Sequence, residues 1–182
     1  MWEGVDEWRA ECARVTLHED GLTAHGVQMG AAYRLDYVLV TGEGFVTRML
    51  HIDCWGNGWH RRLLLRRLLD GTWDATGGER RASVPGLAGA LDCDLGFSPL
   101  TNTMPVLRHR LHERAGAEDF LMAWVAVPEL TVHASAQRYE HVRPGVVRYV
   151  DRGTHDGFTA ELELDEDGFA VLYPGLARRV EG

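Results

Sequence analysis

The sequence predicts a mainly β protein, in which an antiparallel meander curls into a roll or a half-open, barrel-like sheet with few or no long helices. Three observations lead to this prediction. Apolar and polar residues alternate with a period of two through much of the chain, which is typical of strands buried on one face. Glycine and acidic residues separate these segments and indicate turns. Because the expected strands are short and closely spaced, their sheet must curl to bury its apolar face and protect its edges.

The first clear pair of strands is expected over 33–40 and 46–53, joined by a hairpin turn at the sequence TGEG. One face of the first strand carries Tyr33, Leu35, Tyr37 and Leu39. One face of the second carries Val46, Arg48, Leu50 and Ile52. These two faces are expected to point into the same core.

The next segment, 59–69, alternates runs of arginine and leucine that form a clean stripe on neither a helix nor a strand. We interpret it as a strand that ends at a turn formed by Asp70 and Gly71, with Trp73 starting the next segment. Residues 75–90 are rich in glycine, alanine and arginine, which predicts a loop.

The carboxyl-terminal half predicts a series of strands separated by turn residues. Pro128 divides the first two of them, and Asp167 with Gly168 turns between the last two. The expected strands lie within 120–127, 130–142, 146–152, 158–165 and 169–175.

Size and composition predict a single domain over residues 1–182. The chain has 182 residues, of which 45% are apolar and 25% charged, an ordinary mixture for a globular protein. Its net charge is −8, which argues against nucleic acid as a partner because phosphate binding needs a basic face. Every basic residue is arginine, a side chain that can bind phosphate or carboxylate through two parallel hydrogen bonds.

The cysteines and the amino terminus favour a cytoplasmic protein. Cys12, Cys54 and Cys93 are few, odd in number and without CxxC spacing, so free thiols are expected in place of disulfides or a zinc site. The amino terminus is acidic and lacks the features of a signal peptide. No apolar stretch is long enough for an integral membrane segment, so a lipid would be bound in a pocket or at the surface.

Common catalytic motifs are missing from the sequence, which contains no GxSxG, Walker loop, GxGxxG or HExxH. The nine histidines are scattered, and the closest pair, His109 and His112, is better explained by a charged surface than by a metal site. The sequence therefore favours a binding protein over an enzyme, with no cofactor and no metal.

The most informative segment, 91–111, contains a dense group of polar side chains. Asp92 and Asp94 are two residues apart, so on a strand both carboxylates would point to the same face. Ser98, Thr101, Asn102 and Thr103 follow between Pro99 and Pro105. One interpretation is a polar loop held by hydroxyl-to-backbone bonds and followed by an ordinary strand. The other is a group of donors and acceptors at the mouth of a pocket, suited to sugar hydroxyls.

This segment carries a resemblance to a known family. Its pattern DxDLxxSPxTNTxPxxR, from Asp92 to Arg108, resembles the most characteristic stretch of the putative glycolipid-binding family of bacteria. Further similar positions occur in the same order along nearly the whole chain: Thr47-Arg48, Asp70 to Trp73, Ala123 to Val125 with Pro128, Gln137 with Tyr139, and Tyr173-Pro174 followed by Arg178-Arg179. Segments 61–67 and 77–81 fit the pattern less well.

The resemblance implies a spiral β-roll, distantly like the lipoprotein-localisation factors that hold acyl chains in a half-open sheet. It implies a carrier or sensor that binds a glycolipid or another amphipathic small molecule, and it brings no catalytic residues. We expect the apolar tail to lie against the concave sheet. The expected wall residues are Trp73, Trp124, Tyr139 and Tyr173. The expected head-group contacts are Arg48, Asp92, Asp94, Asn102, Thr103 and Arg179.

Two alternatives from other classes stay open. In the first, an enzyme acts on a small or lipid-like substrate, with Asp92 and Asp94 as an acid–base pair whose pKa values are split by their proximity. In the second, the chain is an interaction module that binds another protein or forms a homodimer. A filled core without a hollow would favour the second alternative.

Overall fold

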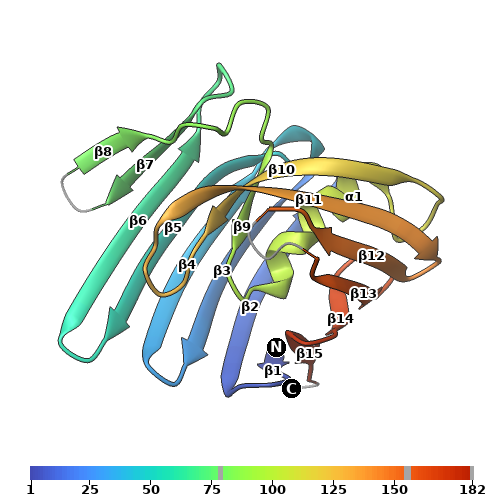
Figure 1. The fold of residues 1–182 in the computed structure, drawn as a ribbon, viewed down its shortest axis with the longest axis horizontal. Coiled ribbons are helices and arrows are strands. Elements are labelled where there is room, and N and C mark those ends of the chain that lie inside the picture. The colour runs from blue at the N-terminus through green and yellow to red at the C-terminus, as the bar shows by residue number, and fades with distance from the viewer. Residues whose placement is uncertain (78–79, 154–156, 181–182) are drawn as a thin grey trace.

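The computed structural model describes residues 1–77, 80–153 and 157–180, and within them most of the chain forms one large β-sheet (Figure 1). Its 15 strands follow the order β8-β7-β6-β5-β4-β3-β2-β1-β15-β14-β13-β12-β11-β10-β9. All neighbours are antiparallel except β9 and β10, which are parallel. The sheet is open, with β8 and β9 at its ends, and the predicted mainly β fold is confirmed.

The strands occupy most of the segments in which alternation predicted them. The bounds are β1 Trp2–Gly4, β2 Arg9–His18, β3 Gly21–Gly30, β4 Tyr33–Thr41, β5 Thr47–Gly56, β6 Trp59–Arg67, β7 Trp73–Gly77, β8 Arg80–Ser83, β9 Asp92–Leu95, β10 Ala117–Val125, β11 Val132–Arg143, β12 Val146–Asp151, β13 Thr159–Leu164, β14 Ala170–Tyr173 and β15 Ala177–Arg179. The helical segments are η1 Glu43–Phe45, η2 Pro99–Asn102 and α1 Thr103–His109.

The sheet consists of two meanders that join where the chain ends meet. Strand β1 pairs with β15, with Trp2 opposite Arg179, which brings the two termini side by side (Figure 1). At its other end the sheet curls back on itself. The backbone N–H of Cys93 on β9 donates a 3.0 Å hydrogen bond to Oγ1 of Thr47 on β5. The N–H of Thr47 donates to the carbonyl of Leu91 at 3.0 Å. The result is a spiral roll that is not closed into a barrel.

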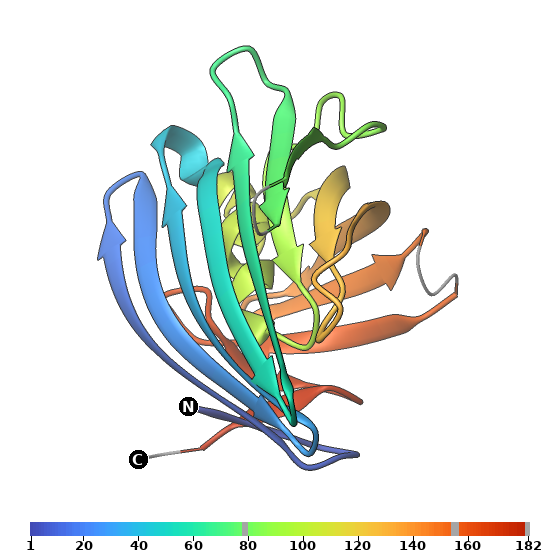
Figure 2. The same cartoon turned by 90° about the vertical axis from the view of Figure 1, so that its left-hand side faces the viewer.

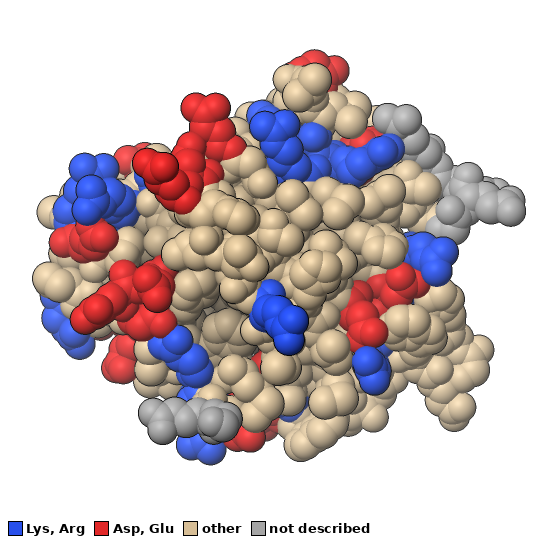
Figure 3. Space-filling view, turned by 180° about the vertical axis from the view of Figure 1, so that it is seen from behind, with Lys and Arg blue, Asp and Glu red and all other residues tan. Residues whose placement is uncertain are grey.

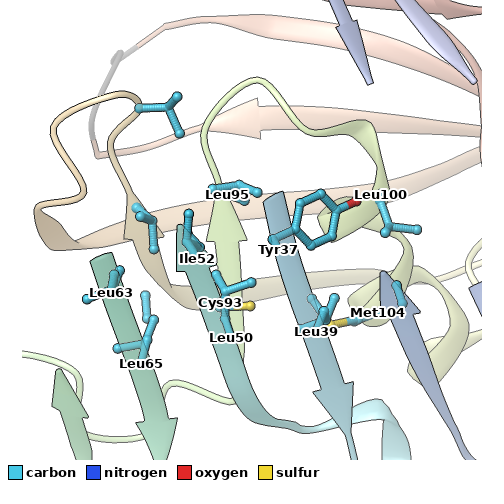
Figure 4. Close-up of a cluster of buried hydrophobic side chains, with 14 of the residues drawn as sticks. Tyr37, Leu39, Leu50, Ile52, Leu63, Leu65, Cys93, Leu95, Leu100 and Met104 are labelled. Carbon is cyan, nitrogen blue, oxygen red and sulfur yellow. The ribbon is translucent and has the colours of Figure 1, made fainter. Parts of the chain in front are cut away.

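The concave side of the amino-terminal meander is filled by the protein's own side chains. Strands β2 to β6 curve strongly, as Figure 2 shows. Leucines of these strands pack against residues from β9, η2 and α1 (Figure 4), so the expected free surface for an apolar tail is occupied. The close-up labels Tyr37, Leu39, Leu50, Ile52, Leu63, Leu65, Cys93, Leu95, Leu100 and Met104.

Helix α1 lies between this cluster and a second one in the carboxyl-terminal meander. Met104 belongs to the first cluster and Val106 to the second. The second cluster has an aromatic centre, where Tyr139 meets Tyr149 edge to face with ring centroids 5.3 Å apart. Such aromatic contacts add to the free energy of burial. The helix therefore joins both halves of the sheet into one packed structure.

Two glycines let aromatic rings lie flat across neighbouring strands. Gly26 is opposite Tyr37, and Gly56 is opposite Trp59. A Cβ atom built on Gly26 would come within 2.2 Å of the Tyr37 ring, and one on Gly56 within 2.1 Å of the Trp59 ring. Each ring covers the backbone that the glycine leaves open, an arrangement that supports strand pairing in curved sheets.

Three local predictions can be compared with the structure. The arginine- and leucine-rich segment forms strand β6, and Trp73 starts β7, as predicted. Residues 75–90 were expected to be a loop, but they complete β7 and contain β8; positions 78–79 lie outside the described residues. Residues 103–109 form a helix and not the strand considered from the sequence. Pro105 fits its first turn because the backbone N–H that proline lacks has no partner there.

Charged side chains of both signs share the outer surface. On the face shown in Figure 3, arginines and carboxylates lie beside one another around a largely uncharged centre. This mixed distribution agrees with the net charge of −8 and differs from the continuous basic surface that binds nucleic acid.

Candidate functional site

A cavity of about 430 Å³ lies in the carboxyl-terminal half, where β9 to β12 and β14 approach the turn after β9. Its volume lies within the range of roughly 300–1,000 Å³ that is common for small-molecule sites. The cavity is lined by Arg9, Asp94, Leu95, Gly96, Phe97, Ser98, Asn102, Trp124, Ala126, Val127, Glu129, Gln137, Tyr149, Asp151, Phe158, Tyr173, Gly175 and Leu176. Polar side chains from separate segments of the chain therefore meet at one hollow.

Asp94 is at the centre of the polar side of the cavity. Nε2 of Gln137 donates a 2.6 Å hydrogen bond to its Oδ2. Oγ1 of Thr101 donates a 3.0 Å hydrogen bond to its Oδ1. Strand β9 places this carboxylate in the cavity because its neighbour Cys93 points to the opposite face, into the core. Each carboxylate oxygen is thus held by one neutral donor.

A chain of hydrogen bonds fixes the group around Asp94. Nδ2 of Asn102 donates to the Tyr139 hydroxyl at 2.6 Å, and this hydroxyl donates to Oε1 of Gln137 at 3.1 Å. Gln137 is therefore oriented with its amide nitrogen towards Asp94. The chain links η2 to β11 and then to β9. Side chains held this way are positioned before a ligand arrives, which reduces the ordering cost of binding.

Burial raises the pKa of Asp94 to about 6, and the nearby carboxylate of Asp151 adds to this increase. The hydrogen bonds from Gln137 and Thr101 act in the opposite direction, because they stabilise the charged form. Asp151 lies on β12 and accepts hydrogen bonds from the backbone N–H of Gly153 at 2.7 Å and from the Tyr149 hydroxyl at 3.4 Å. The cavity thus contains two carboxylates whose charges influence each other.

Aromatic rings form the remaining walls and the mouth. Tyr149 and Tyr173 are buried, with ring centroids 5.9 Å apart, and Phe158 packs against both at 6.1 and 6.4 Å. Phe97 and Phe158 are 41% and 40% exposed, so both rings are accessible to solvent. Trp124 is half-buried along the same cavity. The polar side chains of Ser98, Asn102, Gln137 and Asp151 are therefore buried in the cavity wall, whereas the rings of Phe97 and Phe158 are partly exposed.

A second polar group lies behind the cavity wall. Ser98 lines the cavity and donates a 2.7 Å hydrogen bond to Oε1 of Glu11, which also accepts one from the Tyr37 hydroxyl at 2.5 Å. Oε2 of Glu11 is buried and has no hydrogen-bond partner among the described residues. Burial raises the pKa of Glu11 to about 7, although both hydroxyls lower it. Glu11 therefore titrates near neutral pH directly behind the site.

Four of the ten predicted site residues line the cavity: Asp94, Asn102, Trp124 and Tyr173. Tyr139 is fully buried behind them and contacts Asn102 and Gln137. The fold therefore brings segment 91–111 together with Trp124, Tyr139 and Tyr173, which lie far from it in the sequence. The other five predicted residues lie elsewhere.

Asp92, Thr103 and Trp73 are buried away from the cavity. Arg108 binds both oxygens of Asp92, at 2.8 and 2.5 Å. The indole nitrogen of Trp73 donates to the carbonyl of Ala90 at 3.1 Å, within the core of the amino-terminal meander. The Thr103 hydroxyl is buried without a partner among the described residues. These three side chains do not line the cavity, so Asp92 and Asp94 do not face a common hollow.

The two arginines expected at the head group do not line the cavity either. Arg48 is exposed, although alternation placed it on the face of Leu50 and Ile52. The pairing of β4 with β5 shifts between Val40 and Thr41, and this irregularity turns Thr47 inwards and Arg48 outwards. Arg179 is paired with Asp165, with Nη1 and Oδ2 2.6 Å apart.

Several cavity residues were missed by the sequence analysis, above all Gln137, Tyr149 and Asp151. A weak signal did exist for each. Gln137 precedes the buried Tyr139 by two residues on β11, and Tyr149 precedes Asp151 by two on β12. Polar residues at inward-facing positions of otherwise apolar strands indicate either a buried network or a binding site. No set of three or more histidine, cysteine or acidic side chains among the described residues is arranged to hold a metal ion.

Comparison with known proteins identifies the family. Residues 1–179 match the family described as putative glycolipid-binding. The chain belongs to this family. A solved structure of a DUF1089 family protein from Pseudomonas aeruginosa shares the fold, with a TM-score of 0.75 and 24% sequence identity over 94% of this chain and 92% of the other. No curated protein matches the sequence.

The family's description concerns lipids, so the relation of the chain to membranes is relevant. In the parts of the chain that the structure describes, no helix has the length and apolar character needed to cross a membrane. The longest regular helix, α1, has 7 residues.

Proposed function

We propose that the protein binds a glycolipid or a similar amphipathic molecule, with the polar head group inside the 430 Å³ cavity. The observation that carries this proposal is the polar group of Asp94, Gln137 and Asn102 facing a hollow with aromatic walls. Carboxylate and amide side chains supply acceptors and donors for sugar hydroxyls. Aromatic faces suit the apolar C–H surface of a sugar ring.

The arrangement of the cavity favours entry of the head group first. Ser98, Asn102, Gln137 and Asp151 are buried, whereas Phe97 is exposed at the mouth. A polar head group inside would replace its lost water contacts with these side chains. An apolar tail would leave the cavity along Phe97, Phe158 and Leu176, because the concave surface of β2–β6 is already filled.

This orientation is the reverse of the one expected from the sequence, in which the tail lay inside and the polar residues formed the rim. The physical reason is the position of the segment after β9, which turns its polar side chains into the roll. Burying methylenes of the tail along the mouth contributes about 0.8 kcal/mol for each fully buried group, before the cost of association is subtracted. A carrier and a sensor are both compatible with this binding mode.

The enzyme alternative based on Asp92 and Asp94 loses its geometric support. Asp92 is bound by Arg108 outside the cavity lining, so the two carboxylates cannot act on one substrate as an acid–base pair. A filled core with no hollow would have favoured the alternative of an interaction module, and the cavity supports a small ligand instead.

Native mass spectrometry of the freshly purified protein, together with calorimetric titration of n-octyl β-D-glucopyranoside, tests the proposal. We expect a co-purified amphipathic ligand or saturable binding of the glycoside, and we expect Trp124→Ala to weaken it at least tenfold. Arg48→Ala, far from the cavity lining, is the control and should bind as the unaltered protein does. A ligand-free mass together with no binding of the glycoside would contradict the proposal.

A further inference from the structure

We propose that the head group recognised by the cavity carries an ammonium group, as an amino sugar does, and that Asp94 is its counter-ion. This inference rests on the proposed function and specifies the chemistry of its ligand. It starts from the charges of the cavity. Among the residues that the structure describes, the charged side chains of the lining are Arg9, Asp94, Asp151 and the exposed Glu129.

Arg9 is the basic side chain among the described lining residues, and it already has two partners. Nη1 of Arg9 forms a 2.8 Å ion pair with Glu7, and its guanidinium lies 4.3 Å from the centre of the Phe97 ring at the mouth. A guanidinium that is paired and stacked gains little from an additional anion. Among the described lining residues the carboxylates outnumber this guanidinium, which disfavours phosphate or sulfate head groups and favours a cation.

Asp94, which is half-buried at the cavity wall, differs from two buried aspartates that have an arginine partner. Asp92 is bound by Arg108 through both oxygens, and Asp74 is paired with Arg66 at 3.0 Å. The hydrogen-bond donors to Asp94 are the neutral side chains of Thr101 and Gln137. In the described ranges no basic group lies within ion-pair distance of Asp94. A buried carboxylate without a cation is costly, and a ligand ammonium group would supply the missing charge.

A second polar group points to a ligand in the same place. Tyr173 is 5% exposed and lines the cavity, and its hydroxyl has no hydrogen-bond partner among the residues described. The oxygen of this hydroxyl is not fully buried, so it is open to the hollow. This hydroxyl can accept a hydrogen bond from an N–H or O–H group of the ligand.

The proposal predicts a dependence on pH, because the ammonium group needs the ionised form of Asp94. The pKa of Asp94 is about 6, so its charge is largely present at pH 7.5 and largely lost at pH 5. Binding of the aminated ligand should therefore weaken as the pH falls through 6, and binding of a neutral ligand should change less. The other titratable groups that face the cavity or Asp94 are Arg9, Asp92, Glu129, Tyr139, Tyr149, Asp151 and Tyr173.

The test compares three glycosides with the same octyl chain by calorimetric titration at pH 7. They are n-octyl β-D-glucopyranoside, its 2-amino-2-deoxy analogue and the N-acetylated form of that analogue, in which the charge is removed. We expect the amine to bind at least tenfold more tightly than the other two. Asp94→Asn should remove this preference, so that the ratio of the amine affinity to the neutral-glycoside affinity falls to about one even if all three affinities decrease. Asp36→Asn, on the outer face of β4, is the matched control and should retain it.

A second measurement keeps the proposal testable if Asp94→Asn does not fold. The ratio of the two affinities, amine to neutral glycoside, should fall towards one for the unaltered protein between pH 7.5 and pH 5. Equal affinities at pH 7, or a ratio that is independent of pH, would overturn the ammonium proposal and leave the proposed function intact. No binding of any of the three glycosides would overturn both.

Discussion

Gln137 holds Asp94 in place through a 2.6 Å hydrogen bond from Nε2 to Oδ2, although the two residues are 43 positions apart in the sequence. Strand β10 lies between their strands in the sheet, so this bond crosses over a neighbouring strand inside the roll. The bond stabilises the charged form of Asp94, the residue that we propose as the counter-ion of the ligand. It therefore controls both the position and the charge of Asp94.

Replacement of Gln137 by methionine tests this control. Methionine has a similar length and cannot donate a hydrogen bond. Loss of the donor should raise the pKa of Asp94 above its value of about 6, because burial is then opposed by fewer hydrogen bonds. Carboxyl carbon NMR titration measures the change, with Asp94→Asn to assign the resonance. Gln28→Met, at an equally buried glutamine that bonds to Gly96 and Tyr33, should leave this pKa unchanged. An unaltered pKa in Gln137→Met would contradict the interpretation.

Two tyrosines allow binding to be separated from stability. The Tyr173 hydroxyl has no partner among the described residues, whereas the Tyr139 hydroxyl bonds to both Asn102 and Gln137. Tyr173→Phe should leave the free energy of unfolding within about 0.5 kcal/mol of the original value and weaken ligand binding about fivefold, the effect of one net hydrogen bond. Tyr139→Phe should lower the free energy of unfolding by about 1–3 kcal/mol. Urea denaturation and calorimetry measure both quantities, and the reverse order of stabilities would count against the described network.

The strands could be predicted from the sequence because their signal is local. In β4, Leu35, Tyr37 and Leu39 are buried, as alternation predicts. Arg48 shows where a local signal fails, since the shift in pairing between β4 and β5 reverses the side of the sheet to which it points. Helix α1 shows a second failure, because burial of Met104 and Val106 between two clusters stabilises a helix where the local sequence does not indicate one.

The cavity was only partly predictable, for a different physical reason. Asp94 and Asn102 lie in one segment whose polar residues attract attention in the sequence. Gln137 and Asp151 lie opposite each other on β11 and β12, and their meeting with Asp94 depends on the order and register of strands far apart in the chain. Single-sequence patterns contain no information about that long-range pairing. The same limit explains why Asp92, two residues from Asp94, was grouped with it although Arg108 binds it elsewhere.

The buried pair of Asp92 and Arg108 should be structural. Arg108→Met would leave the Asp92 carboxylate buried without its partner, a change that costs about 3–5 kcal/mol in the free energy of unfolding. Combining it with Asp92→Asn should restore part of the loss, because the uncompensated charge is removed. Arg48→Met, at an exposed arginine, should change stability by less than about 0.5 kcal/mol. A loss below about 1 kcal/mol in Arg108→Met would show that the pair contributes little.

Glu11 should make the protein less stable as the pH rises through neutrality. Its pKa is raised by burial from 4.5 to about 7. Between these two values the folded protein therefore binds more protons at this site than the unfolded chain does. The free energy of unfolding then decreases as the pH increases, by about 3 kcal/mol in total from this residue. The contribution of the protonated form is complete below pH 4.5 and is lost above pH 7.

Glu11→Gln isolates this contribution because glutamine keeps an acceptor for Tyr37 and Ser98 and does not titrate. Urea denaturation at pH 5 and at pH 8 should give a difference in unfolding free energy that is about 2.5 kcal/mol smaller for the variant than for the unaltered protein. The substitution also has a cost that does not depend on pH, including that of the buried amide nitrogen at the position of Oε2. Comparing the two proteins by their differences between pH 5 and pH 8 removes this cost. Parallel dependences on pH in the two proteins would mean that Glu11 stays ionised in the folded state, and that Ser98 and Tyr37 compensate for its burial.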